Sequence, residues 1–535
     1  MIDPIWILIA FILGFAVNRA GLPPLVGYLI AGFVLQAFGV EGGEALEEIA
    51  DLGVTLLLFS IGLKLRLRSL AKPEIWASAS IHMAITVLVF GAAIFSLSLL
   101  GLSTFSALDL KLSLMIAFAL SFSSTVFAVK VLEERGEMSS LHGRVSIGIL
   151  IMQDIFAVVF LTFSTGKIPS PWAVALIGGL ILARPLLFSV LDRVGHRELL
   201  LLFSVFLALG LGAGGFEFVG LKSDLGALLV GVLVAGHSKS GEMAKTLLSF
   251  KDLFLVGFFL NIGLSGAPTM QSFGIAGLLS VGVIFKTVLF FLLLTRFNLR
   301  ARTSMLASLS LATYSEFGLL VASTGYKNNW INSEWLIILA IVLSITLIAA
   351  SPLNSLAHRI YSRFSRRLKP FETKTRLPGD QIIDPGDAEV AIFGMGRVGT
   401  GAYDDMHQRY GKVVIGIDFD EQSVTKHRKA GRNVILGDPT DPDFWERTGP
   451  NKVKTVLLTL PEHQANMLAI KQITSVKFRG SLAATAKFDD QIEELKASGA
   501  DIVYNLYGEA GYGFAKHVCQ SLNADCSLQS RTGNN

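Results

Sequence analysis

The chain has 535 residues, of which 52% are hydrophobic and only 16% are charged, and its formal net charge is +4. The mean hydropathy of +0.56 excludes an ordinary soluble protein and indicates a polytopic membrane protein. The length leaves room for a large membrane domain and one soluble domain. We expect membrane lipids around the chain and no nucleic acid partner.

Thirteen hydrophobic segments follow one another through the first two thirds of the chain. They lie near residues 4–20, 22–38, 47–63, 75–101, 112–133, 143–165, 171–192, 198–215, 222–236, 249–265, 272–296, 303–325 and 333–358. If the N-terminus lies outside, most basic residues of the connecting loops are cytoplasmic. The basic loop residues left on the outer side are Lys111, Lys167, Lys222 and Lys327. This asymmetry predicts an odd number of spans and a cytoplasmic C-terminus.

Asp154 is an intramembrane carboxylate whose neighbours are apolar or uncharged for several turns on either side. It lies at the midpoint of Gly143–Thr165, GRVSIGILIMQDIFAVVFLTFST, which as a helix would be about 34 Å long. An ionised carboxylate is costly at this depth, so such residues usually handle ions or protons. We interpret Asp154 as the site that binds K⁺ or Na⁺ and a proton in turn. The alternative is a structural aspartate satisfied by neighbouring hydroxyls.

Two hydrophobic segments have a polar interruption near their middle. Residues 119–128, ALSFSSTVFA, contain Ser123, Ser124 and Thr125, and residues 312–320, ATYSEFGLL, contain Glu316. In transporters built from inverted repeats, paired broken helices cross near the membrane midplane and direct their ends toward the ion. We therefore predict two crossed broken helices. The alternative for the three hydroxyls is back-bonding within an ordinary helix.

Lys286 is a third intramembrane charge, in SVGVIFKTVLFFLLL. It is too far from either segment end for its ammonium to reach the membrane surface easily. One interpretation pairs Lys286 with Asp154, so that a cation bound at Asp154 competes with that pair. The other is that the lysine neutralises the carbonyl ends of half-helices.

The composition changes after the last hydrophobic segment. We assign residues 1–358 to the membrane domain, 359–388 to a basic and polar cytoplasmic linker, and 389–535 to a soluble domain. In the soluble domain, short apolar runs alternate with amphipathic helical stretches, which is typical of a doubly wound parallel sheet. The predicted strands are Val390–Phe393, Val413–Ile417, Asn433–Leu436, Val456–Leu460, Leu482–Thr485 and Ile502–Asn505. The predicted fold is thus a polytopic α-helical membrane domain followed by a cytoplasmic Rossmann-like α/β domain.

A glycine-rich loop opens the soluble domain. Residues 394–399 read GMGRVG and place three glycines in a G-x-G-x-x-G pattern between a strand and a helix. The residues of this predicted loop are Gly394, Met395, Gly396, Arg397, Val398 and Gly399. Asp418 ends the second predicted strand, where an acid binds ribose hydroxyls and disfavours a 2′-phosphate, so we predict AMP or NAD(H). Asp438 either contacts the adenine side or caps a turn.

These features together resemble the Kef branch of the monovalent cation:proton antiporters, with a C-terminal RCK/KTN (TrkA-N) domain. The resemblance rests on the SFSST break, Gln153-Asp154, Lys286, the SEFG break and the GMGRVG loop, which follow one another in that order along the chain. The segment DLGVTLLLFSIGLKLRL (51–67) resembles the third span of that family and its following loop. The resemblance covers nearly the whole chain.

The resemblance implies a thirteen-span antiporter that forms a homodimer and has an elevator-like core. A nucleotide on the C-terminal domain would regulate transport without being chemically changed, so the protein is not expected to be an enzyme. Electrogenic sodium relatives carry two adjacent carboxylates where this chain has Gln153 and Asp154. The single charge therefore implies an electroneutral exchange of K⁺ for H⁺. Gln153, Ser123, Ser124 and Thr125 would replace part of the hydration shell of the cation bound at Asp154.

One region departs from the Kef pattern. Kef systems resemble each other in an acidic loop with a His-Ala-Leu-Glu signature, whereas residues 237–252 here read HSKSGEMAKTLLSFKD. The resemblance therefore does not extend to glutathione gating. Three alternatives stay open: a Na⁺/H⁺ antiporter of the same fold, a ligand-gated K⁺ channel, and a membrane-bound nicotinamide enzyme. The last would normally need a second nucleotide-binding domain, and this sequence has one candidate.

Overall fold

The computed structural model describes the chain in two compact units. It covers all residues except 1–3, 21, 41, 65–69, 102–103, 136, 139, 164–170, 196–197, 220–222, 382–384, 442–443, 446–451, 477 and 522–535. The first unit comprises residues 1–130 and 145–374, and the second comprises residues 131–144 and 375–535. Lys167 and Lys222, two of the basic residues predicted to be outside, lie beyond the described residues.

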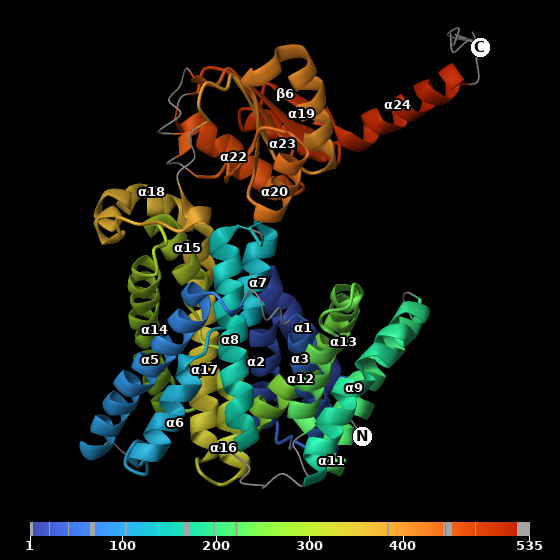
Figure 1. Ribbon diagram of the computed structural model, residues 1–535. Coiled ribbons are helices and arrows are strands. Elements are labelled where there is room, and N and C mark those ends of the chain that lie inside the picture. The colour runs from blue at the N-terminus through green and yellow to red at the C-terminus, as the bar shows by residue number, and fades with distance from the viewer. Residues whose placement is uncertain are drawn as a thin grey trace, which may run out of the picture. The chain divides into compact units, whose positions relative to one another are not determined.

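The first unit is helical, and each predicted hydrophobic segment coincides with one helix or with consecutive helices (Figure 1). These are α1 (Pro4–Arg19), α2 (Pro24–Ala37), α3 (Glu44–Lys64), α5 (Pro73–Leu99), α6 (Leu110–Ser121), α7 (Thr125–Glu134), α8 (Leu141–Phe163), α9 (Pro171–Arg193), α10 (Glu198–Val205), the π-helix η1 (Phe206–Gly214), α11 (Gly215–Phe218), α12 (Ser223–Val234), α13 (Ser240–Leu264), α14 (Met270–Arg296), α15 (Ala301–Ser310), α16 (Glu316–Lys327), α17 (Ser333–Ser355) and α18 (Ala357–Leu368). Thus the predicted helical architecture is confirmed.

Six helical stretches are long and apolar enough to cross a membrane. They are Pro73–Leu99, Leu110–Glu133, Leu141–Leu161, Glu198–Phe218, Met270–Arg296 and Ser333–Ser355. Shorter apolar helices accompany them at Pro4–Arg19, Pro24–Ala37, Leu225–Val234 and Leu253–Leu264. The chain is therefore a multi-pass membrane protein, whereas the number of thirteen spans stays a prediction.

Close glycine contacts join α2 and α3 to α13 and α12 in the later part of the unit. Gly32 in α2 meets Gly263 in α13, and a Cβ added to Gly32 would lie 2.7 Å from the Cα of Gly263. Gly62 in α3 meets Gly231 in α12 in the same way, with a corresponding distance of 2.9 Å. We call α1 to α8 the first half of the unit and α10 to α17 the second half. In the first half, α2 thus packs on α13 of the second half, and α3 packs on α12. Such reciprocal contacts, made through residues without side chains, are expected of inverted repeats in a membrane.

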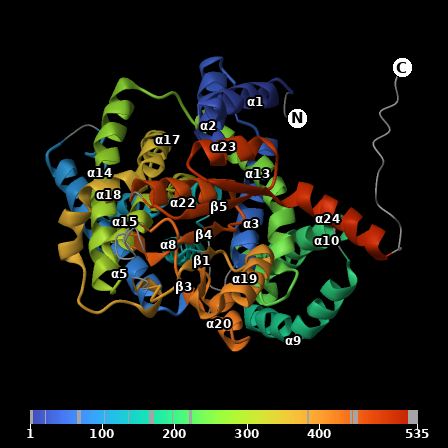
Figure 2. The ribbon, with the colours of Figure 1, turned by 90° about the horizontal axis from the view of Figure 1, so that it is seen from above.

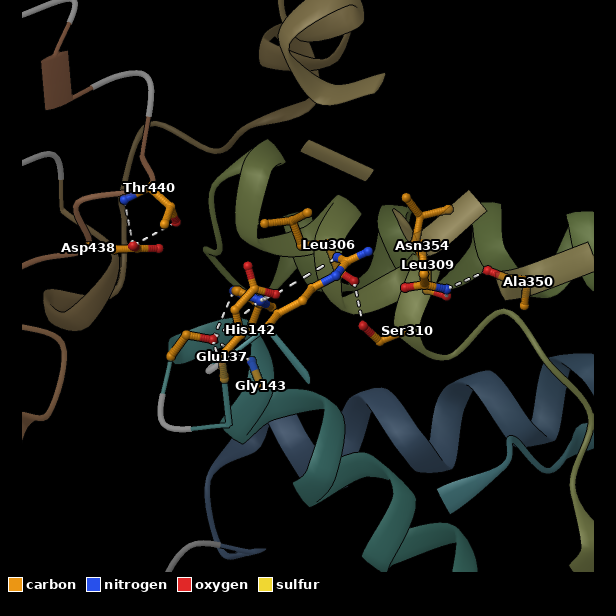
Figure 3. A network of polar contacts seen from close by, with 12 residues as sticks. Glu137, His142, Gly143, Leu306, Leu309, Ser310, Ala350, Asn354, Asp438 and Thr440 are labelled. Carbon is orange, nitrogen blue, oxygen red and sulfur yellow. Dashed lines mark hydrogen bonds and ion pairs between the residues drawn. The ribbon is translucent and has the colours of Figure 1, made fainter. Parts of the chain in front are cut away.

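The remaining helices of each half form a second bundle that contains both broken helices. α5, α6, α7 and α8 come from the first half, and α14, α15, α16 and α17 come from the second. Asn354 in α17 fastens α15, because its Nδ2 donates hydrogen bonds to the carbonyls of Leu309 (2.8 Å) and Ala350 (3.1 Å), as Figure 3 shows. Both predicted breaks are present: α6 ends at Ser121 before α7 begins at Thr125, and α15 ends at Ser310 before α16.

The second unit contains a six-stranded, fully parallel sheet in the order β3-β2-β1-β4-β5-β6. The strands are β1 (Val390–Phe393), β2 (Val414–Asp418), β3 (Val434–Leu436), β4 (Thr455–Leu458), β5 (Ser481–Ala486) and β6 (Ile502–Asn505). Among the described residues, the connecting helices are α19 (Arg397–Tyr410), α20 (Glu421–Lys429), α22 (His463–Ser475) and α23 (Asp490–Ala497), followed by α24 (Leu506–Ser521), and most of them appear in Figure 2. This is the predicted Rossmann-like topology, with β1 at the crossover point of the strand order.

The central strands are buried because helices cover the sheet, which explains their continuous apolar sequences. All four residues of β1 are buried, and Phe393 packs against the rings of Phe444 and Trp445. The predicted linker differs from the structure in one respect. Residues 357–368 form the helix α18, and the first unit extends to residue 374. The alternation of basic and apolar residues in α18 is typical of an amphipathic helix, and the boundaries of the predicted linker stay a prediction.

Candidate ion-binding site and nucleotide loop

The two broken helices meet at their interruptions. The backbone N–H of Ser124 donates a hydrogen bond to Thr313 Oγ1 at 3.1 Å, and Ser124 Oγ donates to Glu316 Oε2 at the same distance. The helices approach closely because α16 carries Gly318, where a Cβ would lie 2.3 Å from the carbonyl oxygen of Ala119 in α6. The breaks of the first and second halves therefore form one polar crossing inside the second bundle.

Lys286 bridges the carbonyl ends of both breaks. Its Nζ donates hydrogen bonds to the carbonyls of Phe122 (2.6 Å) and Thr313 (3.2 Å), and it lies 4.6 Å from the centroid of the Tyr314 ring. The side chain is fully buried. The ends of α6 and α15 carry partial negative charge, so a buried ammonium is stabilised there. Within the described residues Lys286 forms no ion pair with Asp154, so this structure contains the second predicted arrangement instead of the predicted pair.

Glu316 plays the opposite electrostatic role at the start of the half-helices. It is the first residue of α16, and its Oε2 accepts hydrogen bonds from Ser124 Oγ and from the N-cap residue Ser315 (3.4 Å). A carboxylate beside a helix N-terminus is favourable because the unsatisfied N–H groups there carry partial positive charge. Glu316 therefore compensates the amino ends at the crossing, as Lys286 compensates the carboxyl ends.

Gln153 braces the first break rather than presenting both of its polar atoms to an ion. Its Oε1 accepts a hydrogen bond from the backbone N–H of Ser123 at 2.9 Å, and its Nε2 donates to the carbonyl of Ser121 at 3.4 Å. Since α6 has ended at Ser121, these backbone groups have lost their helical partners, and the amide side chain replaces them. Gln153 therefore fixes the backbone of the first break, and its role as a cation ligand stays a prediction.

Asp154 lies beside the same break and is 1% exposed. Its two carboxylate oxygens are 3.5 and 3.4 Å from Thr125 Oγ1, at the long limit of hydrogen bonding. Ser123 Oγ is buried and has no hydrogen-bond partner in the described part of the chain. The site residues predicted from the membrane sequence thus come together: Ser123, Ser124, Thr125, Gln153, Asp154, Lys286 and Glu316 all line or brace the crossing.

The described residues contain no group of three or more His, Cys, Asp or Glu side chains that would hold a metal ion. A single carboxylate with hydroxyl neighbours suits weak, exchangeable binding of a hard monovalent cation, for which oxygen ligands are appropriate.

The glycine loop of the second unit has the geometry of a phosphate cradle. Gly394 has φ +90°, and a Cβ at Gly399 would lie 1.8 Å from the carbonyl oxygen of Gly394, so both positions require glycine. A Cβ at Gly396 would meet nothing within 4 Å, and Gly396 is itself the N-cap of α19, which begins at Arg397, so the N-cap residue supplies no capping side chain. The middle glycine thus faces open space at a helix N-terminus, where a pyrophosphate fits.

Asp418 is the last residue of β2, as the nucleotide prediction requires. Its carboxylate forms hydrogen bonds with the glycine loop and with residues that follow β2. Its Oδ2 accepts hydrogen bonds from the backbone N–H of Met395 (2.9 Å) and from Ser423 Oγ (3.1 Å). Its Oδ1 accepts one from the backbone N–H of Asp420 at 2.9 Å. Oδ2 thus already accepts two hydrogen bonds, whereas Oδ1 accepts one and can accept a second, for example from a ribose hydroxyl.

The other predicted loop residues differ in exposure and role. Met395 is buried, and its carbonyl oxygen lies 2.8 Å from Nε2 of His427 in α20, whereas Val398 is 40% exposed. Asp438 follows β3 and accepts hydrogen bonds from the backbone N–H (2.8 Å) and Oγ1 (2.7 Å) of Thr440, which Figure 3 shows. Asp438 is therefore a turn-capping residue, the second of its two predicted roles.

Sequence reasoning missed one contact near the nucleotide loop. Arg144 Nη1 donates a hydrogen bond to the backbone carbonyl of Phe419 at 3.3 Å, next to Asp418. Arg144 belongs to the second unit, yet it lies in the first turn of α8, the helix that also carries Asp154. Just before it, Glu137 Oε2 lies 3.1 Å from Nε2 of the buried His142 (Figure 3). The only sequence signal was a basic residue at the start of a hydrophobic segment, which is equally typical of a membrane boundary.

Comparisons with known proteins agree with this geometry. The family model "Sodium/hydrogen exchanger, transmembrane" matches residues 7–355, and the "TrkA-N domain" model matches residues 390–506. The glutathione-regulated potassium-efflux system protein KefC of Cronobacter sakazakii is 27% identical over 507 residues, covering 90% of this chain and 78% of KefC. The putative cation/proton antiporter YbaL of Escherichia coli is 26% identical over 542 residues, covering 93% of each chain.

A similar solved structure is the sodium proton antiporter MjNhaP1 of Methanocaldococcus jannaschii at pH 8. It has a TM-score of 0.48 and 13% identity, and the match covers 66% of this chain and 96% of that chain. The family assignment rests instead on the two sequence models, the first of which spans more than half of the chain. The chain therefore belongs to the sodium/hydrogen exchanger family, as a Kef-type cation/proton antiporter that carries a C-terminal TrkA-N domain.

Proposed function

We propose that this protein exchanges K⁺ for H⁺ across the bacterial inner membrane in an electroneutral cycle, as a homodimer with the N-terminus outside. The ionised carboxylate of Asp154 binds either the cation or a proton, so each movement of the site across the membrane carries one of the two. The KefC relative is named for potassium efflux, which favours K⁺ over Na⁺ as the cation.

The observation that carries this proposal is the distribution of charge around the crossing. Lys286 is engaged by carbonyls of both breaks, and Glu316 is engaged by hydroxyls at the start of α16. Asp154 is the buried carboxylate beside the first break, and its oxygens lie 3.5 and 3.4 Å from Thr125 Oγ1. A carboxylate in this setting is stable when a cation or proton neutralises it.

Three oxygen-bearing side chains supply the ligands in this mechanism. Asp154 provides the charge, and the hydroxyls of Ser123 and Thr125 replace part of the hydration shell. Gln153 fixes the backbone at the break, which keeps the hydroxyls in place. The single carboxylate moves one charge in each direction, so the exchange produces no net current.

The test is proton movement in proteoliposomes after addition of K⁺ or Na⁺, with and without a clamped membrane potential. We expect a K⁺-dependent proton flux that does not depend on the potential and that disappears in Asp154→Asn. Asp51→Asn, a change of the same chemistry at a carboxylate that is 67% exposed, should leave the flux intact. Retained exchange in Asp154→Asn would contradict the proposal. A larger response to Na⁺ would assign the alternative cation, and a flux without protons would indicate a channel.

We further propose that AMP or NAD(H) binds the TrkA-N domain and controls exchange. Gly394, Gly396 and Gly399 would hold the pyrophosphate or phosphate, and Asp418 would accept hydrogen bonds from the ribose. The nucleotide would act by altering the loop that follows β2, where Phe419 accepts the hydrogen bond from Arg144. Because Arg144 and Asp154 lie on one helix, ten residues apart, a displaced loop would act on the ion site through α8.

Two variants separate binding from control in the full-length protein. Asp418→Asn should weaken AMP or NADH binding measured by calorimetry. Arg144→Gln should keep that binding but remove the effect of the nucleotide on the exchange rate. Unchanged binding in Asp418→Asn would reject the ribose assignment, and a nucleotide response that survives in Arg144→Gln would reject the proposed route.

A further inference from the structure

A row of polar side chains runs along the buried face of α5, a helix that the ion site does not use. Glu74, Ser78, His82 and Thr86 recur at every fourth residue, so they lie on one ridge of the helix, about 6 Å apart. Ser78, His82 and Thr86 have no exposed surface, and Glu74, at the first turn, is 9% exposed. The row therefore enters the protein interior from one end of α5.

Three atoms of this row have no hydrogen-bond partner in the described part of the chain. They are Ser78 Oγ, His82 Nδ1 and Thr86 Oγ1. Leaving buried polar atoms unpaired costs free energy, so native proteins pair them with protein groups or with ordered water. Three such atoms on one ridge indicate a shared cause, because isolated packing accidents would not be spaced regularly.

Hydroxyls elsewhere on the same helix form hydrogen bonds with backbone carbonyls of that helix. Ser80 Oγ donates a hydrogen bond to the carbonyl of Trp76 at 2.8 Å, and Ser96 Oγ donates to that of Ala92 at 2.8 Å. Both are ordinary bonds to the residue four positions earlier. Ser78 and Thr86 have the same helical option but do not use it, so their hydroxyls are available to another acceptor or donor.

His82 connects the row to the ion site. Its ring stacks on Phe290 with a centroid distance of 3.5 Å, and its Nε2 lies 3.3 Å from the backbone carbonyl of Lys286. A carbonyl only accepts hydrogen bonds, so Nε2 carries the hydrogen and Nδ1 is the acceptor. Lys286 is also the charged group that the described contacts place against His82, and its ammonium bridges the two breaks.

We propose that Glu74, Ser78, His82 and Thr86 line a narrow passage that water enters transiently, since the three inner residues of the row have no exposed surface, and that brings protons to the level of Lys286. Water is the occupant because it both donates to Nδ1 and pairs with the two hydroxyls. A spacing of about 6 Å corresponds to two hydrogen bonds through one water molecule. The basic loop before α5 predicts that the mouth at Glu74 is cytoplasmic. The role of the passage in proton supply rests on the proposed antiport, but its hydration does not.

Cysteine accessibility tests the passage without measuring transport. In the full-length protein with Cys519→Ser and Cys526→Ser, single cysteines at Ser78, Thr86 and Ala79 are treated with 2-aminoethyl methanethiosulfonate and followed by mass spectrometry. Ala79 is a matched control because it lies on the same helix and is also 0% exposed. We expect Ser78→Cys and Thr86→Cys to react at least ten-fold faster than Ala79→Cys.

Equal, slow labelling at all three positions would overturn the passage, and rotation of the hydroxyls toward backbone carbonyls would then explain the row. If Thr86→Cys does not fold, the comparison of Ser78→Cys with Ala79→Cys decides alone. A second measurement concerns proton supply: Thr86→Val should slow exchange several-fold, whereas Ser80→Ala should not. Fast labelling in a protein that exchanges no cations would leave the passage standing and reject the proposed function.

Discussion

The two bundles of the membrane unit are held together by different means. In the first, backbone meets backbone at glycines: Gly32 against Gly263 and Gly62 against Gly231. In the second, the helices are interrupted and their ends are joined by buried polar groups, with Lys286 at the centre. Apolar contact between smooth helices is rigid and needs no charge, whereas a polar crossing depends on every partner being present.

The difference indicates a division of labour. A bundle locked by glycine contacts has few alternative packings, because any side chain would separate its helices. The polar crossing instead contains Asp154, the carboxylate that we propose changes charge during transport. We infer that the first bundle is the stationary part of the protein and that the second contains the moving site. The following substitutions test the contacts that hold each bundle together.

The largest effect should come from filling a glycine contact. Gly231→Leu would place its Cβ 2.5 Å from the carbonyl oxygen of Phe59, and the backbone cannot yield easily. We expect a loss of stability of several kcal/mol, seen as a lower unfolding temperature in detergent. Gly274→Leu in α14 is the control, because a Cβ there meets nothing within 4 Å. Equal unfolding temperatures for the two variants would contradict the proposed locking of the first bundle.

Removing the ammonium at the crossing should affect both stability and transport. Lys286→Met keeps the length of the side chain but leaves the carbonyls of Phe122 and Thr313 without their donor. Each buried, unsatisfied group costs about 1–3 kcal/mol, so we expect a clear decrease in unfolding temperature and a loss of most exchange. Lys111→Met, at an exposed residue of α6, should change neither quantity. Full exchange in Lys286→Met would show that the half-helix ends do not need this cation.

A smaller effect should follow from the brace at the first break. Gln153→Leu removes the acceptor of the Ser123 N–H and the donor to the Ser121 carbonyl. We expect about 1–3 kcal/mol of destabilisation and a reduced apparent affinity for K⁺, because the hydroxyl ligands are no longer held. The dependence of the exchange rate on K⁺ concentration measures this. A variant with reduced maximal rate but unchanged affinity would assign Gln153 to the movement of the site instead.

The smallest effect concerns an ion pair between the bundles. Lys327, at the end of α16, lies 2.8 Å from Glu47 Oε1 and 3.4 Å from Asp51 Oδ1 in α3. Partial burial lowers the pKa of Lys327, but the hydrogen bond with Glu47 and the charge of Asp51 raise it above its ordinary value. All three side chains are well exposed, so the pair contributes up to about 1 kcal/mol.

A lysine whose pKa is raised by folding contributes stability below its unfolded pKa of about 10.4 and loses it as the pH rises through the folded pKa. The difference in unfolding temperature between wild type and Lys327→Met should therefore be constant from pH 6 to pH 9 and shrink at still higher pH. A difference that already disappears near neutral pH would show that the pair is not the cause.

Much of this architecture could be predicted from the sequence, because hydrophobic runs and strand patterns are local signals. The predicted strands Val390–Phe393 and Ile502–Asn505 agree with the structure at both ends, and both helix breaks lie where Ser123 and Glu316 indicated. The partners of Lys286 could not be predicted in this way. A sequence shows a buried charge but not which of several distant acceptors will surround it.

Two further features lay beyond sequence reasoning for related reasons. The nine-residue π-helical stretch Phe206–Gly214 gives no compositional signal distinct from an α-helix. The contact between Arg144 and Phe419 joins residues 275 positions apart, and nothing in either neighbourhood specifies the other. The row along α5 could have been read from its four-residue spacing, but its meaning depends on which hydroxyls lack partners.

The glycine loop of the TrkA-N domain has a consequence for protein engineering. The tight turn at Gly394 and the contact made by Gly399 tolerate no side chain, so substitutions there would disable the domain by unfolding its first crossover. Gly396 has φ −71°, and a Cβ there meets nothing within 4 Å, so we expect the fold to accept alanine or valine, whose side chain would occupy the position of the proposed phosphate. A substitution at this one position would give a correctly folded TrkA-N domain that cannot bind the proposed nucleotide, without any change in the membrane domain.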